Sequence, residues 1–249
     1  MPDPQPIPAA TLVLFRERAD GPPELLMVER AKAMAFAGGA MVFPGGRIDP
    51  EDRQLAELHP DLEHAAARIA AIRETVEEAG VAIGLSPPPS PDMLAELRRR
   101  LHAGVAFGRA LGELGLALDP SGLVPFARWL PAHLHARVFD TLFFLSRAPA
   151  DADATADRTE NVRLVWTSAR AMIEEVDAGR ATAIFPTRRN LERLARFGSF
   201  ADAVADARAY PIRAVTPWTE TRDGVEHLCI PDDFGYPITS EVLTAAVRG

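Results

Sequence analysis

Apolar runs separated by turn-forming residues mark the N-terminal part of the chain. Residues 9–15 and 24–28 are rich in Leu and Val and flank a Gly-Pro-Pro turn, so they predict two β-strands. Residues 40–43 predict a third, short strand that ends at a Pro-Gly-Gly sequence. Residues 49–60 are polar and bounded by prolines, which predicts a surface loop.

The clearest helix is predicted between Asp61 and Gly80. Asp61 follows a proline and suits the N-cap position, while Gly80 suits the position just after the last turn. Between them, apolar residues recur at spacings of three and four: Ile69, Ile72, Val76 and Ala79. This pattern predicts an amphipathic helix with a single apolar face.

The rest of the chain mixes helical and strand-like segments. A proline-rich break precedes a largely helical stretch, residues 92–118, which we interpret as part of an insertion. Because no regular βαβ repeat is present, the order of elements favours an α/β fold with a mixed β-sheet flanked by helices. Further strands are predicted at 138–145 and 162–166, helices at 169–178, 188–197 and 199–209, and a hairpin turn at Asp223-Gly224.

Composition and charge exclude several classes of protein. No apolar run of about 18 residues is present, so no membrane span is expected. The net charge of −8 argues against a nucleic-acid partner, which normally meets a basic surface. Cys229 is the only cysteine and no secretory signal is evident, so a cytoplasmic location is expected. The sequence leaves open whether the chain is a monomer or a homodimer.

Three glutamates share one side of the predicted helix. At about 100° per residue, Glu74, Glu77 and Glu78 fall within an arc of about 100°, opposite the apolar face. Carboxylates this close repel one another, and Mg²⁺ or Mn²⁺ would compensate because hard cations take oxygen ligands. Arg73 lies four residues before Glu77 and can pair with it. The alternative is that the charged run simply faces solvent.

These residues resemble the motif of the Nudix hydrolases. The Nudix box reads Gly, five residues, Glu, seven residues, Arg-Glu-apolar-x-Glu-Glu-x-Gly-apolar. Here Gly46 begins it and residues 73–81, RETVEEAGV, end it, with Thr75 in place of an apolar residue. Asp52 stands where the first Glu is expected. The arginine is then expected at position 60 but stands at 73, so thirteen additional residues interrupt the box.

The interrupted box resembles one Nudix branch, the peroxisomal coenzyme A diphosphatases and their bacterial relatives. The resemblance runs from about residue 9 to about residue 200. It implies an α/β/α sandwich for a Nudix domain spanning residues 1–200, with insertions at about 49–60 and 86–122. Residues 201–249 are left as a C-terminal extension, which we expect to pack on the same domain.

The resemblance implies roles for individual box residues. Glu77 and Glu78 match the carboxylates that bind metal directly, and Glu74 matches one that binds metal or orients the attacking water. Gly46 matches the glycine whose carbonyl completes the metal shell. Arg73 matches the arginine that positions the glutamates. The implied cofactor is Mg²⁺ or Mn²⁺.

Outside the box, three further residues are candidates. Glu160 falls where many Nudix enzymes keep another carboxylate on a loop, although a solvent-exposed loop carboxylate is an equal alternative. Residues 26–46 fit without a gap a pattern that precedes the box in some coenzyme A Nudix enzymes. Ala35 replaces the second arginine of that pattern, whereas Arg30 remains and could bind a phosphate. Arg47 is the second candidate for binding the substrate.

Three functions are compatible with these patterns. The preferred one is metal-assisted hydrolysis of the pyrophosphate bond of coenzyme A or acyl-coenzyme A. The second is hydrolysis of ADP-ribose, a dinucleotide or a nucleotide sugar, which the loss of an arginine at Ala35 mildly favours. The third is a non-catalytic nucleotide-binding Nudix domain, which the intact Arg-Glu and Glu-Glu pairs of the box argue against. In each case the expected partner is a small nucleotide.

Overall fold

A computed structural model describes residues 5–31, 37–131, 138–149, 152, 154–156 and 161–246. Its centre is an eight-stranded sheet of order β10-β7-β8-β1-β2-β3, in which β4 also pairs with β1 and β9 with β2. The pairs β1·β8 and β10·β7 are parallel and the others are antiparallel, so the sheet is mixed, as predicted. The strands are β1 (Ile7–Arg16), β2 (Glu24–Arg30), β3 (Met41–Val42), β4 (Gly45–Arg47), β7 (Val124–Trp129), β8 (Phe139–Arg147), β9 (Asn161–Thr167) and β10 (Ala214–Val215).

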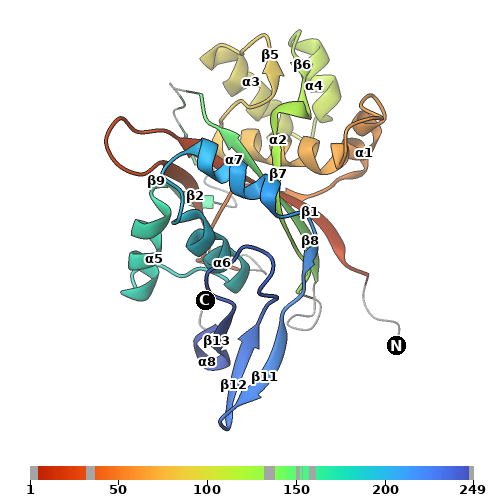
Figure 1. Cartoon of the computed structure of the whole chain (residues 1–249). Helices are drawn as coiled ribbons and strands as arrows, with labels where there is room; N and C mark the ends of the chain where they lie inside the picture. The colour runs from red at the N-terminus through yellow and green to blue at the C-terminus, as the bar shows by residue number, and fades with distance from the viewer. Residues whose placement is uncertain are drawn as a thin grey trace.

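Helices cover both faces of this sheet (Figure 1). On one face lie α1 (Pro50–Ala56), α2 (Ala65–Ala79), α3 (Pro91–His102) and α4 (Phe107–Glu113). On the other lie α5 (Ala169–Asp177), α6 (Phe185–Leu194) and α7 (Phe200–Ala209). The predicted α/β/α sandwich is therefore confirmed.

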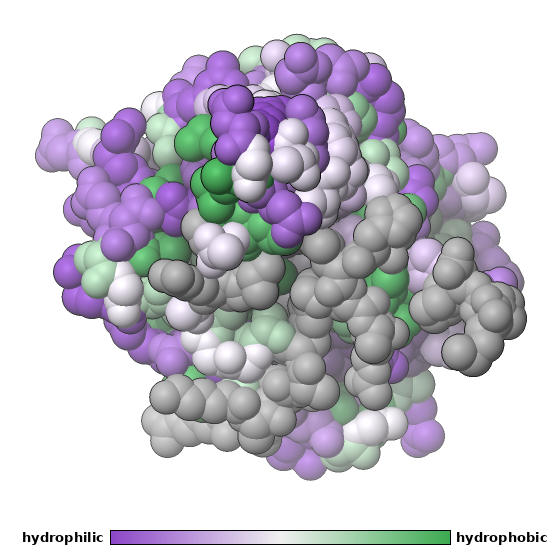
Figure 2. Space-filling model, turned by 90° about the horizontal axis from the view of Figure 1, so that it is seen from below, coloured by the Kyte–Doolittle hydropathy of each residue, from purple (hydrophilic) through white to green (hydrophobic). Residues whose placement is uncertain are grey.

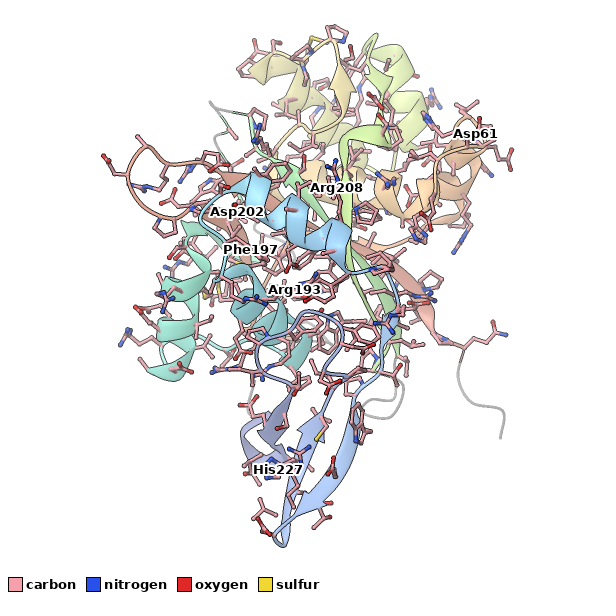
Figure 3. The ribbon with its side chains drawn as sticks, viewed as in Figure 1. Asp61, Arg193, Phe197, Asp202, Arg208 and His227 are labelled. Atoms are coloured by element: carbon pink, nitrogen blue, oxygen red, sulfur yellow. The ribbon has the colours of Figure 1, made fainter. Side chains whose placement is uncertain are left out.

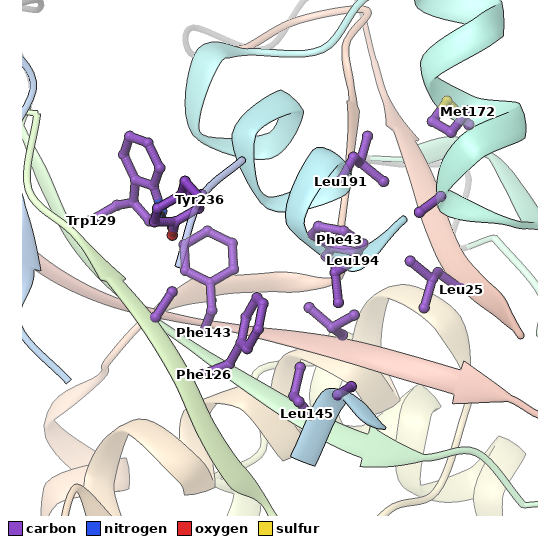
Figure 4. Close-up of a cluster of buried hydrophobic side chains, with 14 of the residues drawn as sticks. Leu25, Phe43, Phe126, Trp129, Phe143, Leu145, Met172, Leu191, Leu194 and Tyr236 are labelled. Carbon is purple, nitrogen blue, oxygen red and sulfur yellow. Dashed lines mark hydrogen bonds between the residues drawn. The ribbon is translucent and has the colours of Figure 1, made fainter. Parts of the chain in front are cut away.

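Strand β1 lies in the middle of the sheet and carries apolar side chains on both faces. Leu12 and Leu14 pack into a cluster with α2, whereas Val13 and Phe15 pack into a second cluster with α5, α6 and α7. Successive strand residues point to opposite faces, so a strand covered on both faces reads as a continuous apolar run. Figure 4 shows part of the second cluster, in which Leu191 and Leu194 of α6 lie beside Phe43.

Helix α2 begins later than predicted. The chain enters it at His64, which has a left-handed backbone with φ of 59°, and not at Asp61. Asp61 lies in a turn and is exposed at the edge of the molecule (Figure 3). The expected N-cap is therefore wrong, because tight turns follow Asp61 before the first helical residue. The predicted end is confirmed, since Gly80 is left-handed with φ of 64°.

The predicted loop at residues 49–60 is also wrong, because residues 50–56 form helix α1. Asp49 and Asp52 form a capping box: each carboxylate meets the backbone N–H of the other residue. Pro50 occupies the first helical position, where its missing N–H costs nothing. The same polar composition that indicates a loop thus also provides a helix start, and Asp52 is fully buried.

The remaining elements are smaller. The 92–118 region is largely helical, as predicted, and a two-stranded sheet of β5 (Leu85–Ser86) and β6 (Ala117–Leu118) and a 3₁₀ turn (Pro120–Gly122) accompany its helices. A three-stranded sheet projects from the body (Figure 1) and consists of β11 (Trp218–Arg222), β12 (Val225–Cys229) and β13 (Ser240–Val242), followed by α8 (Leu243–Ala246). The predicted hairpin turn is confirmed by positive φ at Asp223 and Gly224.

The face that carries the projecting hairpin is mostly polar. Figure 2 views it directly and shows hydrophilic residues over much of the coloured surface, with smaller apolar areas between them. Trp218, Val225, Ile238 and Val242 are the large apolar residues exposed in this C-terminal segment. Within the described part of the chain, every helix is too short or too polar to cross a lipid bilayer.

Candidate active site

Arg73 lies at the centre of the candidate site and contacts several of its residues. It lies on α2 with only 8% of its side chain exposed. Its Nη1 donates to Glu74 Oε1 at 3.0 Å and to Glu77 Oε2 at 3.4 Å. Its Nη2 donates to the backbone carbonyl of Arg47 at 3.0 Å. The arginine therefore links two of the three helix glutamates to the end of strand β4.

Asp52 is the partner of Arg73 that the sequence interpretation missed. Its carboxylate accepts a two-pronged pair of hydrogen bonds, from Nε at 3.1 Å and from Nη2 at 2.9 Å. A bidentate, charge-assisted pair of this kind fixes the orientation of the guanidinium plane. The available signal was the position of Asp52 in the box, where five residues separate it from Gly46 and a carboxylate is expected.

Gly45 and Gly46 of strand β4 lie directly against the glutamates. The N–H of Gly45 donates to Glu78 Oε2 at 2.9 Å. A Cβ atom placed on Gly46 would overlap the carboxylate of Glu74, so any other residue here would displace that carboxylate from its present position. These two glycines are held in place because β4 pairs with β1, where Gly46 is opposite Ala10.

The glutamates are more buried than the predicted polar face implied. Glu78 is only 4% exposed, and the side chains of Glu74 and Glu77 are 15% and 26% exposed. Burial raises the pKa of Glu74 to about 8; the charge of Arg73 opposes this, and the charges of Glu78 and Glu77 add to it. Burial also raises the pKa of Glu77, against the charges of Arg73 and His102. The face predicted to be opposite the apolar one is thus largely covered by protein, with Glu77 its most exposed glutamate.

The surroundings of Arg73 favour its charged form, whereas those of Glu74 favour its neutral form. Burial alone would lower the pKa of Arg73, but hydrogen bonds to Asp52 and the charges of Glu74 and Glu77 outweigh it and raise the pKa above its usual value. Arg73 is therefore a permanent cation among carboxylates. Its single charge is shared by the carboxylates of Asp52, Glu74 and Glu77.

The described residues contain no ready-made group of three His, Cys, Asp or Glu side chains that could hold a metal ion. Glu74 and Glu77 share Arg73, and Glu78 is held by Gly45. The chemistry of the donor set nevertheless fits Mg²⁺ or Mn²⁺, because carboxylate and carbonyl oxygens are the ligands these hard cations take. The raised pKa of Glu74 indicates that additional positive charge would be favourable here.

The candidates outside the box fall in different places. Arg30 ends β2, where strand alternation puts it on the same face as Leu26, which packs with α2. Its Nε is buried and has no hydrogen-bond partner among the described residues. Arg47 ends β4 and is exposed. Glu160, like Ala35, lies outside the described residues.

A solved structure decides the family. The chain matches a NUDIX hydrolase from Alicyclobacillus acidocaldarius with a TM-score of 0.70 and 30% identity, over 81% of this chain and 96% of that one. The chain belongs to the Nudix hydrolase family. Family membership makes it a pyrophosphohydrolase, and the predicted resemblance is confirmed. No protein-family model matches the sequence.

Curated relatives of this Nudix hydrolase point to one branch. The human acyl-coenzyme A diphosphatase NUDT19 is 27% identical over an alignment of 280 positions, gaps included. The alignment covers 88% of this chain and 74% of the human protein. The Gallus gallus protein of the same name is also 27% identical, over 72% of this chain and 63% of its own length. These similarities support the resemblance to the coenzyme A diphosphatase branch.

Proposed function

We propose that this Nudix hydrolase uses divalent metal ions to cut the pyrophosphate bond of coenzyme A or acyl-coenzyme A. The observation that carries the chemistry is the grouping of Glu74 and Glu77 around Arg73, with Glu78 beside them bonded to Gly45 of β4. The similarity to NUDT19 carries the choice of substrate. The products would be 3′,5′-ADP and phosphopantetheine or its acyl form.

We assign the metal to the helix glutamates. Glu77 and Glu78, with Glu74 and the carbonyl of Gly46, would hold Mg²⁺ or Mn²⁺. The bound ions supply charge neutralisation of the pyrophosphate oxygens and a more acidic water. Arg73 keeps Glu74 and Glu77 in place through its Nη1. Glu74 is our candidate to orient the attacking water and take up its proton, and we leave Glu160 as a second carboxylate for this role.

The adenosine 3′-phosphate would distinguish coenzyme A from other nucleotides. Arg30 is our candidate for binding it, because its buried Nε has no partner among the residues that the structure describes, and such a nitrogen favours an anionic ligand. Arg47, exposed at the end of β4, is the second candidate. A site built to pair this phosphate leaves a cation unpaired when the phosphate is missing, which weakens transition-state binding.

A substrate panel tests this proposal. Coenzyme A, an acyl-coenzyme A, dephospho-coenzyme A, ADP-ribose, NADH and nucleoside triphosphates are incubated with Mg²⁺ or Mn²⁺, and the products are identified by mass. We expect coenzyme A or acyl-coenzyme A to have the highest kcat/KM. Removal of the 3′-phosphate should lower kcat/KM more in the wild type than in Arg30→Ala, with Arg53→Ala on the exposed side of α1 as the control.

The panel separates the alternatives. Equal activity on coenzyme A, dephospho-coenzyme A and ADP-ribose would reject the coenzyme A assignment and leave a pyrophosphohydrolase of broader specificity. Binding of nucleotides without turnover of any of them would favour a non-catalytic domain.

A further inference from the structure

The last turn of α2 ends against the inserted helix α3. This turn carries Glu77 and Glu78, whose backbone carbonyls have no partner within the helix. Arg98 of α3 meets both of them: its Nε donates to the carbonyl of Glu77 at 2.8 Å and its Nη2 to that of Glu78 at 2.9 Å. One guanidinium therefore holds the backbone of the two residues whose carboxylates we assign to the metal.

The other two carbonyls of this turn are also satisfied. Val76 accepts from the N–H of Gly80 at 3.0 Å, and Ala79 accepts from the N–H of Thr155 at 2.9 Å. Arg98 Nη1 in turn donates to the hydroxyl of Thr155 at 2.9 Å. A Cβ on Gly80 would lie 3.2 Å from Arg98 Nη1, so the glycine that ends the box also leaves space for this arginine.

Helix α3 is a firm support for Arg98. Leu97 and Leu101 on the same helix are buried in the cluster that includes α2. Arg98 therefore spans from a fixed helix to the end of another. A cation at this position also interacts favourably with the negative end of the α2 dipole.

We propose that Arg98 is a positioning residue for catalysis, which holds the last turn of α2 so that Glu77 and Glu78 present their carboxylates together. It acts through backbone carbonyls and touches no substrate. This inference rests on the proposed function, because it takes Glu77 and Glu78 as metal ligands. It assigns a catalytic purpose to the helical insertion, residues 86–122, that supplies α3.

Arg98→Ala tests the proposal, with Arg99→Ala as a matched control. Arg99 is the next residue on α3, its side chain is 67% exposed, and it pairs with Glu96 on the same helix. Hydrogen exchange of the metal-free protein reports on residues 77–81, and titration with Mn²⁺ alone reports on the metal site. Neither measurement depends on turnover of a substrate.

We expect Arg98→Ala to speed exchange at residues 77–81 by about tenfold, the effect of losing about one net hydrogen bond. We expect the affinity for Mn²⁺ and the value of kcat each to fall by about 10- to 100-fold, as for other residues that orient metal ligands. Arg98→Lys should recover part of both, since an ammonium group can reach one carbonyl but lacks the planar fork that meets two. Arg99→Ala should match the wild type.

A folded Arg98→Ala protein with wild-type exchange and wild-type Mn²⁺ binding would overturn the proposal. So would a loss confined to thermal stability, with Mn²⁺ binding and kcat unchanged below the melting temperature. If Arg98→Ala does not fold, Arg98→Lys against Arg99→Lys decides by the same two measurements. Failure of the metal assignment itself is recognised separately, because Glu77→Gln would then leave Mn²⁺ binding unchanged.

Discussion

Glu78 is a buried carboxylate with a structural contact as well as an assigned chemical role. It is 4% exposed and accepts the N–H of Gly45. A buried charge is tolerated only when it is paired and hydrogen-bonded. The hydrogen bond of Glu78 stabilises the start of β4, while burial of its ionised form costs free energy. Substitution by glutamine separates the two roles, because an amide oxygen can still accept from Gly45 while the charge is lost.

We expect Glu78→Gln to lower kcat by more than about 100-fold, beyond the loss typical of residues that only orient metal ligands. The melting temperature should stay close to that of the wild type, since the hydrogen bond to Gly45 is kept and no cavity opens. Activity and circular dichroism melting check this, with Glu63→Gln as the control because its side chain is 80% exposed. A folded Glu78→Gln enzyme with near-normal activity at saturating Mg²⁺ would refute the site assignment.

At the scale of elements, α1 acts as a brace for α2 and for the inserted helices. Asp52 of α1 holds Arg73 of α2 through two hydrogen bonds. On the same helix, Glu51 accepts the N–H groups of Phe107 and Gly108 at 2.9 Å and 3.0 Å, where α4 begins. A segment expected as an exposed loop thus joins the helical insertion, residues 86–122, to α2.

We expect Asp52→Ala to lower the free energy of unfolding by about 3 to 5 kcal/mol, because it leaves the charge of Arg73 buried with fewer partners. Activity should fall as well, since the guanidinium loses the contact that orients it. Urea denaturation measures the stability. Asp61→Ala is the control and should cost under about 0.5 kcal/mol, because Asp61 is exposed and does not cap α2. Similar small costs for both variants would show that α1 is not a brace.

At the scale of the whole molecule, polar side chains of α6 tie the C-terminal segment to the sandwich. Arg193, labelled on α6 in Figure 3, pairs with Asp206 of α7. Arg189 pairs with Glu241 of β13 at 3.0 Å. Tyr236 lies in the core cluster shown in Figure 4. These contacts join residues that are far apart in sequence, on the α6 side of the molecule and away from the glutamates of α2.

Tyr236→Phe should destabilise the protein by about 1 to 3 kcal/mol without changing kcat. The buried hydroxyl accepts from Trp129 Nε1 at 2.8 Å and donates to Asn190 Oδ1 at 3.0 Å, so its removal leaves both groups unpaired. Burial raises the pKa of Tyr236 to about 12, which keeps the hydroxyl protonated. Tyr210→Phe is the control, because no hydrogen bond of its hydroxyl is found among the described residues. An equal effect on both would show that the buried network contributes little.

Features that are local or periodic could be predicted from the sequence alone. The two long N-terminal strands, the apolar face of α2, its end at Gly80 and the hairpin turn follow from residue spacing and glycine positions, and the structure has all of them. The box residues were recognisable for the same reason, since Arg73 and the three glutamates lie within six consecutive positions. Such signals need no partner elsewhere in the chain.

The partners of the charged box residues lie far away in sequence, so folding alone brings them together. Asp52 is 21 residues from Arg73, and Arg98 is 21 residues from Glu77, with no periodic pattern to connect either pair. Residues 49–60 were interpreted as a loop because their charges suit solvent equally well, and burial against α2 and α4 reversed that choice. The glutamate face was expected opposite the core, yet strand β4 and the insertions cover it. Charge repulsion is visible in a sequence, whereas the partners that offset it come from packing.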